Sequence, residues 1–177
     1  MLNPIHWQPT ALRYRLPISA HEIPWLLETG SLTARIRQAC PQMHVEILSE
    51  QWEVPLPFEA QRLKLRDHRK AWVRCVLLKC DDTPWVYGRT VIPRCRPGNP
   101  WYPLQRLGTQ PLGEVLFRLK QLQRTPLQVA STFGQAWPYL PEAFQTQKMN
   151  ARHCLFRRQG AELLLSEVFL ATPSPSP

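Results

Sequence analysis

Two neighbouring stretches of the chain, residues 71–79 and 84–92, are rich in β-branched and aromatic residues, which is the pattern of β-strands. Residues 80–83 between them have the composition of a turn. The sequence therefore predicts a β-hairpin with a four-residue loop. Side chains alternate between the two faces of a strand. Two shared faces result: Trp72, Arg74, Val76 and Leu78 on the first strand, and Trp85, Tyr87, Arg89 and Val91 on the second.

Helical and strand patterns are mixed along the rest of the chain, which favours an α+β fold. Ser31 can cap a short helix that runs through Arg37. We expect a single domain over residues 1–177, with a flexible lead-in at 1–11 and a flexible Ser/Pro tail at 171–177. The other expected elements are helices within 21–40 and from Thr109 to about Leu122, strands at 43–54, 126–132, 152–157 and 162–170, and a long loop or short helix at 134–150.

Charged residues interrupt the apolar strands. If Lys79 pairs with Pro84 across the loop, Arg74 lies opposite Arg89 on an otherwise apolar face. Like charges directly opposite each other destabilise a sheet. We therefore expect an internal carboxylate or a bound anion between the two arginines. The alternative is that one or both arginines reach solvent at a sheet edge.

Glu167 belongs to the last predicted strand and shares a face with Leu163, Leu165 and Phe169. An unpaired buried carboxylate is costly and has a raised pKa. Glu167 is therefore expected to pair with an arginine, or to stand near a ligand as a proton donor or acceptor. Together the two arginines and Glu167 predict an anion pocket, and the alternative is a plain ion pair within the sheet.

Composition narrows the class of protein. The chain has 177 residues, of which 44% are hydrophobic, so it can bury a core and is not a disordered chain. It carries a net charge of +9, and 17 of its 22 basic residues are arginine. Most of the excess positive charge lies in residues 59–106. This points to an anionic partner, either nucleic acid or a small carboxylate or phosphate.

Other classes are not supported by the sequence. No apolar run approaches the roughly 18 residues of a membrane span, and the first residues do not have the pattern of a signal peptide. The five cysteines have no metal-site spacing. We expect reduced thiols in the cytoplasm, with neither a structural disulfide nor a metal site.

Several motifs in order resemble the chorismate pyruvate-lyase family, over a region from about Leu12 to Leu170. The motifs are Leu12-Arg13-Tyr14, Trp25-Leu26-Leu27, Ser31-Leu32-Thr33, Trp72-Val73-Arg74-Cys75-Val76, Pro84-Trp85, Gly88-Arg89-Thr90-Val91-Ile92-Pro93, Pro111-Leu112-Gly113 and Leu163-Leu164-Leu165-Ser166-Glu167. The resemblance implies an antiparallel sheet with the ligand enclosed beneath helical flaps. It also implies conversion of chorismate to 4-hydroxybenzoate and pyruvate without a cofactor, at the start of ubiquinone synthesis.

The resemblance assigns roles to five residues. Arg74, Arg89 and Glu167 would be catalytic, and Leu32 and Leu112 would bind substrate together with Arg74 and Glu167. The chain departs from the family pattern after Arg74, where an acidic residue is replaced by Cys75. It departs again in a longer 134–150 segment, and in Ala151-Arg152-His153 where the family often has Ala-Arg-Arg.

Two other function classes compete with the lyase. One is a small-acid-sensing module without turnover, because the effector domains of certain transcription regulators resemble the same fold. The other is a basic RNA-binding domain, which requires exposed positive charge and binding that weakens steeply with salt. For the lyase we expect a small-molecule substrate, no nucleic acid, no membrane insertion and a monomer.

Overall fold

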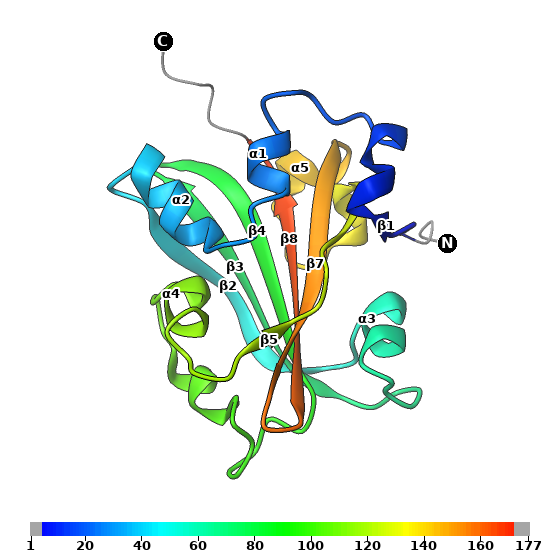
Figure 1. Ribbon diagram of the computed structural model, residues 1–177, viewed down its shortest axis with the longest axis vertical. Helices are drawn as coiled ribbons and strands as arrows, with labels where there is room; N and C mark the ends of the chain where they lie inside the picture. The colour runs from blue at the N-terminus through cyan, green and yellow to red at the C-terminus, as the bar shows by residue number, and fades with distance from the viewer. Residues whose placement is uncertain (1–4, 172–177) are drawn as a thin grey trace.

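The computed structural model describes residues 5–171 and is built around one antiparallel sheet (Figure 1). Its strand order is β1-β6-β7-β8-β4-β3-β2, and β5 pairs with β7 outside this path. The strands are β1 (Gln8–Pro9), β2 (His44–Glu53), β3 (Ala71–Cys80), β4 (Thr83–Ile92), β5 (Gln123–Arg124), β6 (Gln128–Phe133), β7 (Lys148–Arg158) and β8 (Ala161–Phe169). The predicted α+β fold in a single domain is confirmed.

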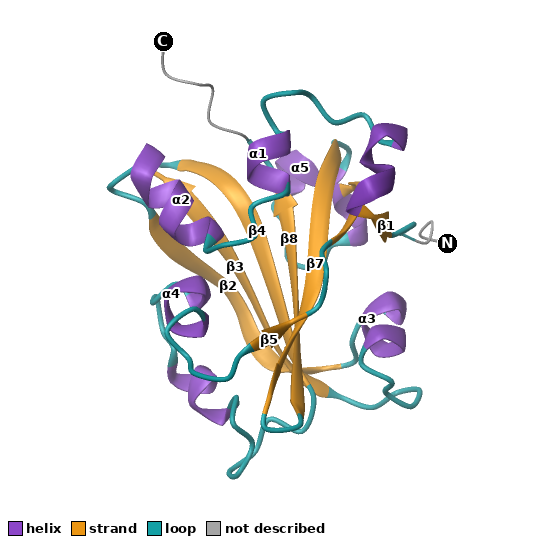
Figure 2. Ribbon diagram, in the orientation of Figure 1, coloured by secondary structure: helices purple, strands orange, loops and turns teal. Residues whose placement is uncertain are grey.

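Short helices cover both faces of the sheet (Figure 2). The α-helices are α1 (Ile23–Leu26), α2 (Leu32–Ala39), α3 (Pro57–Arg62), α4 (Leu112–Leu116) and α5 (Glu142–Gln145), and the 3-10 helices are η1 (Thr10–Arg15), η2 (Tyr102–Arg106) and η3 (Gly134–Ala136). The segments α1, α2 and α4 pack on one face, and those around α3 and α5 pack on the other. We call the first the flap face. Among the helices of residues 5–171, none has the length and apolar composition needed to span a bilayer.

Local sequence signals account for several boundaries. The Ser31 hydroxyl accepts a hydrogen bond from the Ala34 N–H at 3.2 Å, so the predicted cap of α2 is confirmed. The helix expected from Thr109 to Leu122 is much shorter, since α4 spans only Leu112–Leu116; Gln121, with a positive φ of 59°, lies in the turn that follows before β5. Within the predicted lead-in, the structure places β1 at Gln8–Pro9 and the start of η1 at Thr10. Residues 1–4 and 172–177 of the predicted flexible ends lie outside the described residues.

A β-bulge changes the predicted register of the central hairpin. Lys79 does pair with Pro84, but Leu78 pairs with Val86, which leaves Trp85 as one extra residue on β4. A slip of one residue turns every following side chain to the other face. The expected pairing of Arg74 with Arg89 is therefore wrong: Arg74 pairs with Thr90, and Arg89 pairs with Cys75. The loop has two residues instead of four, because Cys80 pairs with Thr83.

Cys40 and Cys80 form a disulfide, so the expectation of reduced thiols throughout is wrong. The spacing of 40 residues gave no sequence signal, because the two cysteines meet only when α2 lies over the sheet. Cys40 caps the C-terminal end of α2, and Cys80 ends β3. The bond therefore fastens one end of α2 to the sheet. The other cysteines, Cys75, Cys95 and Cys154, are free and buried.

Replacing both Cys40 and Cys80 by alanine should lower the free energy of unfolding by about 2–4 kcal/mol, because a closed loop restricts the unfolded chain. Urea unfolding followed by fluorescence measures this. Dithiothreitol should lower the urea concentration at the unfolding midpoint of the wild type, and it should leave that of the double variant unchanged. A wild-type midpoint that is insensitive to the reductant would contradict the bond's contribution.

Candidate functional site

A cavity lies on the flap face, between the sheet and the α2 and α4 segments. Its walls are largely apolar and come from β3, β4, β8, α2 and α4. Its lining includes Leu32, Thr33, Arg74, Val76, Leu78, Val86, Gly88, Thr90, Leu112, Leu116, Arg124, Arg152, Leu165 and Glu167. Three arginines and one carboxylate thus face a mostly hydrophobic space, which suits a small ligand with more than one negative charge.

Arg74 reaches the cavity from the middle of β3 and is buried. Its guanidinium forms an ion pair with Glu50, the cross-strand neighbour on β2. It also donates a hydrogen bond of 2.7 Å to the carbonyl oxygen of Gly108, which takes a positive φ in the loop before α4. Arg74 therefore holds the loop that leads into α4, and it also presents positive charge to the cavity.

Glu167 lies across from Arg152 in the β7–β8 hairpin. The Arg152 Nε donates to the Glu167 carboxylate at 2.6 Å. The Arg152 Nη1 donates to the backbone carbonyls of Trp25, Leu26 and Glu28 at 3.2, 3.2 and 2.7 Å. The prediction that Glu167 pairs with an arginine is confirmed, although the arginine is Arg152. One buried guanidinium thus joins the carboxylate to the end of α1.

Leu32 and Leu112 line the cavity where their segments form its roof. An ion pair of 2.5 Å between Arg37 and Glu114 joins α2 to α4. A Cβ atom on Gly113 would lie 2.9 Å from the Thr33 hydroxyl, so only glycine allows this close approach. The roof is therefore held by contacts between its own two helices.

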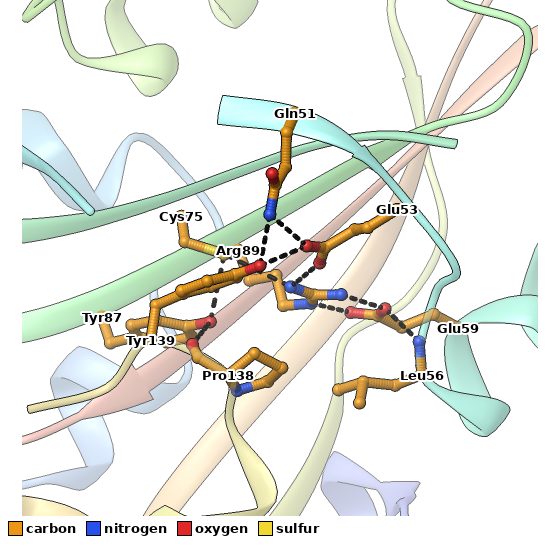
Figure 3. Close-up of polar contacts among 9 residues, drawn as sticks. All are labelled: Gln51, Glu53, Leu56, Glu59, Cys75, Tyr87, Arg89, Pro138 and Tyr139. Carbon is orange, nitrogen blue, oxygen red and sulfur yellow. Dashed lines mark hydrogen bonds and ion pairs between the residues drawn. The ribbon is translucent and has the colours of Figure 1, made fainter. Parts of the chain in front are cut away.

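Arg89 lies on the opposite face from the cavity, because the bulge at Trp85 turns it there. Its Nε and Nη2 donate to the two oxygens of Glu59 at 2.8 and 3.1 Å, and its Nη1 donates to Glu53 at 2.7 Å (Figure 3). The prediction that Arg89 faces the ligand pocket with Arg74 is wrong. Cys75, which replaces the expected acidic residue, accepts from Arg89 at 3.3 Å. The charge of Arg89 is thus balanced by Glu53 and Glu59, two carboxylates that are distant from it in sequence.

Burial and neighbouring charges shift the pKa values of several groups on the face away from the cavity. The pKa of Glu59 is raised by burial, although the Arg89 guanidinium beside it acts in the opposite direction. Burial opposes the charge of Arg89, but the neighbouring Glu59 raises the Arg89 pKa overall. On the same face, His153 packs its ring against Phe58, and burial lowers the His153 pKa to about 3. These groups are structural ion pairs and core residues outside the cavity.

No group of three or more His, Cys, Asp or Glu side chains within residues 5–171 has the arrangement of a metal site. The cavity's own donors are guanidinium groups, which bind carboxylates through paired N–H groups.

Comparison with known proteins agrees with this geometry. The family model described as "Chorismate lyase" matches residues 1–175. The chain belongs to the chorismate lyase family. A "Probable chorismate pyruvate-lyase" of Hydrogenovibrio crunogenus is 49% identical over 166 residues, which cover 93% of this chain and 90% of that protein. Another of the same name, from Aromatoleum aromaticum, is 38% identical over 94% of this chain and 92% of its own length.

The fold of this chorismate lyase family member also resembles a solved regulator domain. The C-terminal domain of a histidine utilization repressor from Pseudomonas syringae pv. tomato matches with a TM-score of 0.52 and 9% identity, covering 77% of this chain and 97% of that one. At this identity the likeness concerns the fold alone.

Sequence reasoning missed two of the arginines in this family member's cavity. Arg152 had a usable signal: a β7–β8 hairpin in which Arg157 pairs with Glu162 also pairs Arg152 with Glu167. Arg124 had none, because it lies in a two-residue strand next to a proline-containing loop. Its position depends on β5 pairing with β7, which no local pattern specifies.

The Arg89→Met substitution should lower the free energy of unfolding by about 3–5 kcal/mol, because it leaves the buried Glu59 carboxylate without its partner. Adding Glu59→Gln should recover part of the loss, since glutamine is neutral and keeps an acceptor for the Leu56 N–H. Chemical denaturation of the three proteins provides the comparison. Equal stability of wild type and Arg89→Met would contradict the role assigned to this ion pair.

Proposed function

We propose that the chain converts chorismate to 4-hydroxybenzoate and pyruvate without a cofactor. The observation that supports this most directly is the largely apolar cavity with three arginines and Glu167, because chorismate carries two carboxylates on a compact ring. The names of the curated relatives agree with this reaction. From the family resemblance we also propose that the product serves a quinone of the ubiquinone type, and that the chain acts in the cytoplasm as a monomer.

The reaction needs positioning and charge stabilisation more than a redox group. The ether bond between the ring and the enolpyruvyl oxygen breaks, and its electron pair leaves with that oxygen. The ring loses one hydrogen as a proton, becomes aromatic, and gains a large driving force. The released enolpyruvate takes up a proton and becomes pyruvate. A largely apolar cavity beneath helical segments reduces contact with water and holds the dianion in a reactive pose.

The cavity residues can divide these tasks. Arg74 would hold one carboxylate through its guanidinium. Glu167, oriented by Arg152, would hydrogen-bond the ring hydroxyl or move a proton. Leu32 and Leu112 would wall the ring from solvent. Arg89 has no substrate contact in this proposal, because it lies on the other face of the sheet.

The assay is incubation of the purified chain with chorismate, with pyruvate and aromatic product measured over time. Pyruvate formation well above the spontaneous rate supports the lyase. Tight binding of chorismate without pyruvate would favour the small-acid-sensing module. An RNA-binding function receives no support from Arg74 or Arg89, because both are buried.

The Arg74→Met substitution should lower kcat/KM for chorismate about 100-fold, because a charged hydrogen bond to the substrate contributes about 1.5–3 kcal/mol. Steady-state kinetics measures the loss, and circular dichroism checks that the variant folds despite the freed Glu50. Near-normal turnover by a folded variant would remove Arg74 from substrate binding.

The Glu167→Gln substitution should lower kcat by about 10²–10⁴-fold if the carboxylate moves a proton. The glutamine can still accept the hydrogen bond from Arg152, so the cavity should keep its shape. The pH dependence of kcat for the two enzymes is the decisive measurement. An unchanged rate and pH profile would limit Glu167 to orienting the substrate or to holding Arg152.

A further inference from the structure

Four arginines lie in or beside the sheet interior, and three of them have carboxylate partners. Arg74 pairs with Glu50, Arg152 pairs with Glu167, and Arg89 pairs with Glu53 and Glu59. The fourth, Arg124, forms no ion pair with any residue in the range 5–171. Its charge is therefore not neutralised by a neighbouring side chain, although it lines the cavity.

Neutral groups hold the Arg124 guanidinium in place. Its Nε donates to the Cys154 sulfur at 3.1 Å, and its Nη1 donates to the Thr29 carbonyl oxygen at 2.6 Å. Its guanidinium carbon lies 5.3 Å from the centre of the Phe156 ring, the cross-strand neighbour. Sulfur is a weak acceptor, and neither partner carries a negative charge. The side chain is thus positioned in advance while its charge remains available for an anion.

Arg124 lies between the cavity and the protein surface. Besides the cavity, it lines an outer hollow together with Thr10, Arg13, Leu27 and Thr29. Arg13 adds a second positive charge to that hollow. A negatively charged group that is held at Arg124 therefore lies on the side of the cavity nearest this hollow.

The proposed substrate needs a second cation. Arg74 has one carboxylate and one carbonyl partner and can hold a substrate carboxylate as well, whereas Arg152 already donates to Glu167 and to three backbone carbonyls. Arg89 is on the opposite face. Arg124 is the cavity arginine that remains. We propose that Arg124 binds the enolpyruvyl carboxylate of chorismate, while Arg74 holds the ring carboxylate. This inference rests on the proposed lyase function.

The assignment gives Arg124 a role in distinguishing substrate from product. 4-Hydroxybenzoate keeps the ring carboxylate and lacks the enolpyruvyl one. Arg124 therefore contributes to binding of chorismate and little to binding of the aromatic product. A purely structural arginine would affect both ligands alike.

The test is the Arg124→Gln variant, which removes the charge and keeps an N–H donor for the Thr29 carbonyl. We expect kcat/KM for chorismate to fall about 10- to 100-fold, mainly through KM, as for a lost charged hydrogen bond. The dissociation constant of 4-hydroxybenzoate, measured by calorimetry, should change by less than about threefold. Arg118→Gln is the matched control, because Arg118 is exposed and does not line the cavity; it should leave both values unchanged.

The possible outcomes separate the two proposals. An active wild type with an unchanged Arg124→Gln variant would overturn the role of Arg124 alone. Equal losses for chorismate and 4-hydroxybenzoate would also overturn it, because they would indicate a structural contribution. A wild type that forms no pyruvate would overturn the lyase and this inference together.

Discussion

One extra residue in β4 decides which side of the sheet each of its charges occupies. The bulge at Trp85 reverses the alternation, so that Val86, Gly88 and Thr90 face the cavity while Arg89 faces away. Without the bulge, Arg89 would take the place of Thr90 opposite Arg74, and Tyr87 would take the place of Gly88 opposite Val76. A Cβ atom on Gly88 would already lie 3.3 Å from Val76, so the floor has little room to spare. Both the size and the charge of the cavity therefore depend on this register.

The same register separates two kinds of buried charge. On the face away from the cavity, Arg89 is matched by Glu59 and Glu53, so its charge serves the packing of α3 and β2 against the sheet. On the flap face the charges are not fully matched: Arg74 pairs with Glu50 and Arg152 with Glu167, whereas Arg124 has no carboxylate partner within residues 5–171. Burying an unmatched charge costs free energy unless a ligand supplies the opposite charge. The excess positive charge is thus a property of the cavity and not of the interior as a whole.

Alternation along single strands could be predicted from sequence, and it correctly grouped Arg74 with Val76 and Leu78, and Glu167 with Leu165. Pairing between strands could be predicted only in part. The β7–β8 hairpin was located, but a bulge has no reliable local signature, so the neighbour of Arg89 was misassigned. Contacts between distant segments, such as Cys40 with Cys80 and Arg124 with Cys154, depend on the complete fold. The family resemblance predicted the reaction. It also assigned Arg89 to the ligand pocket, whereas Arg89 lies on the opposite face of the sheet.

The arginines of the cavity also hold its roof, so charge and closure depend on the same groups. Arg152 donates to carbonyls at the end of α1, and Arg124 donates to the carbonyl of Thr29 just beyond. The segment that follows leads into α2, whose far end is fixed to β3 by the Cys40–Cys80 bond. A carboxylate bound at Arg124 can use the Nη2 group while Nη1 still donates to the Thr29 carbonyl. Ligand charge and the position of the α1–α2 connection are therefore physically linked, because one guanidinium serves both.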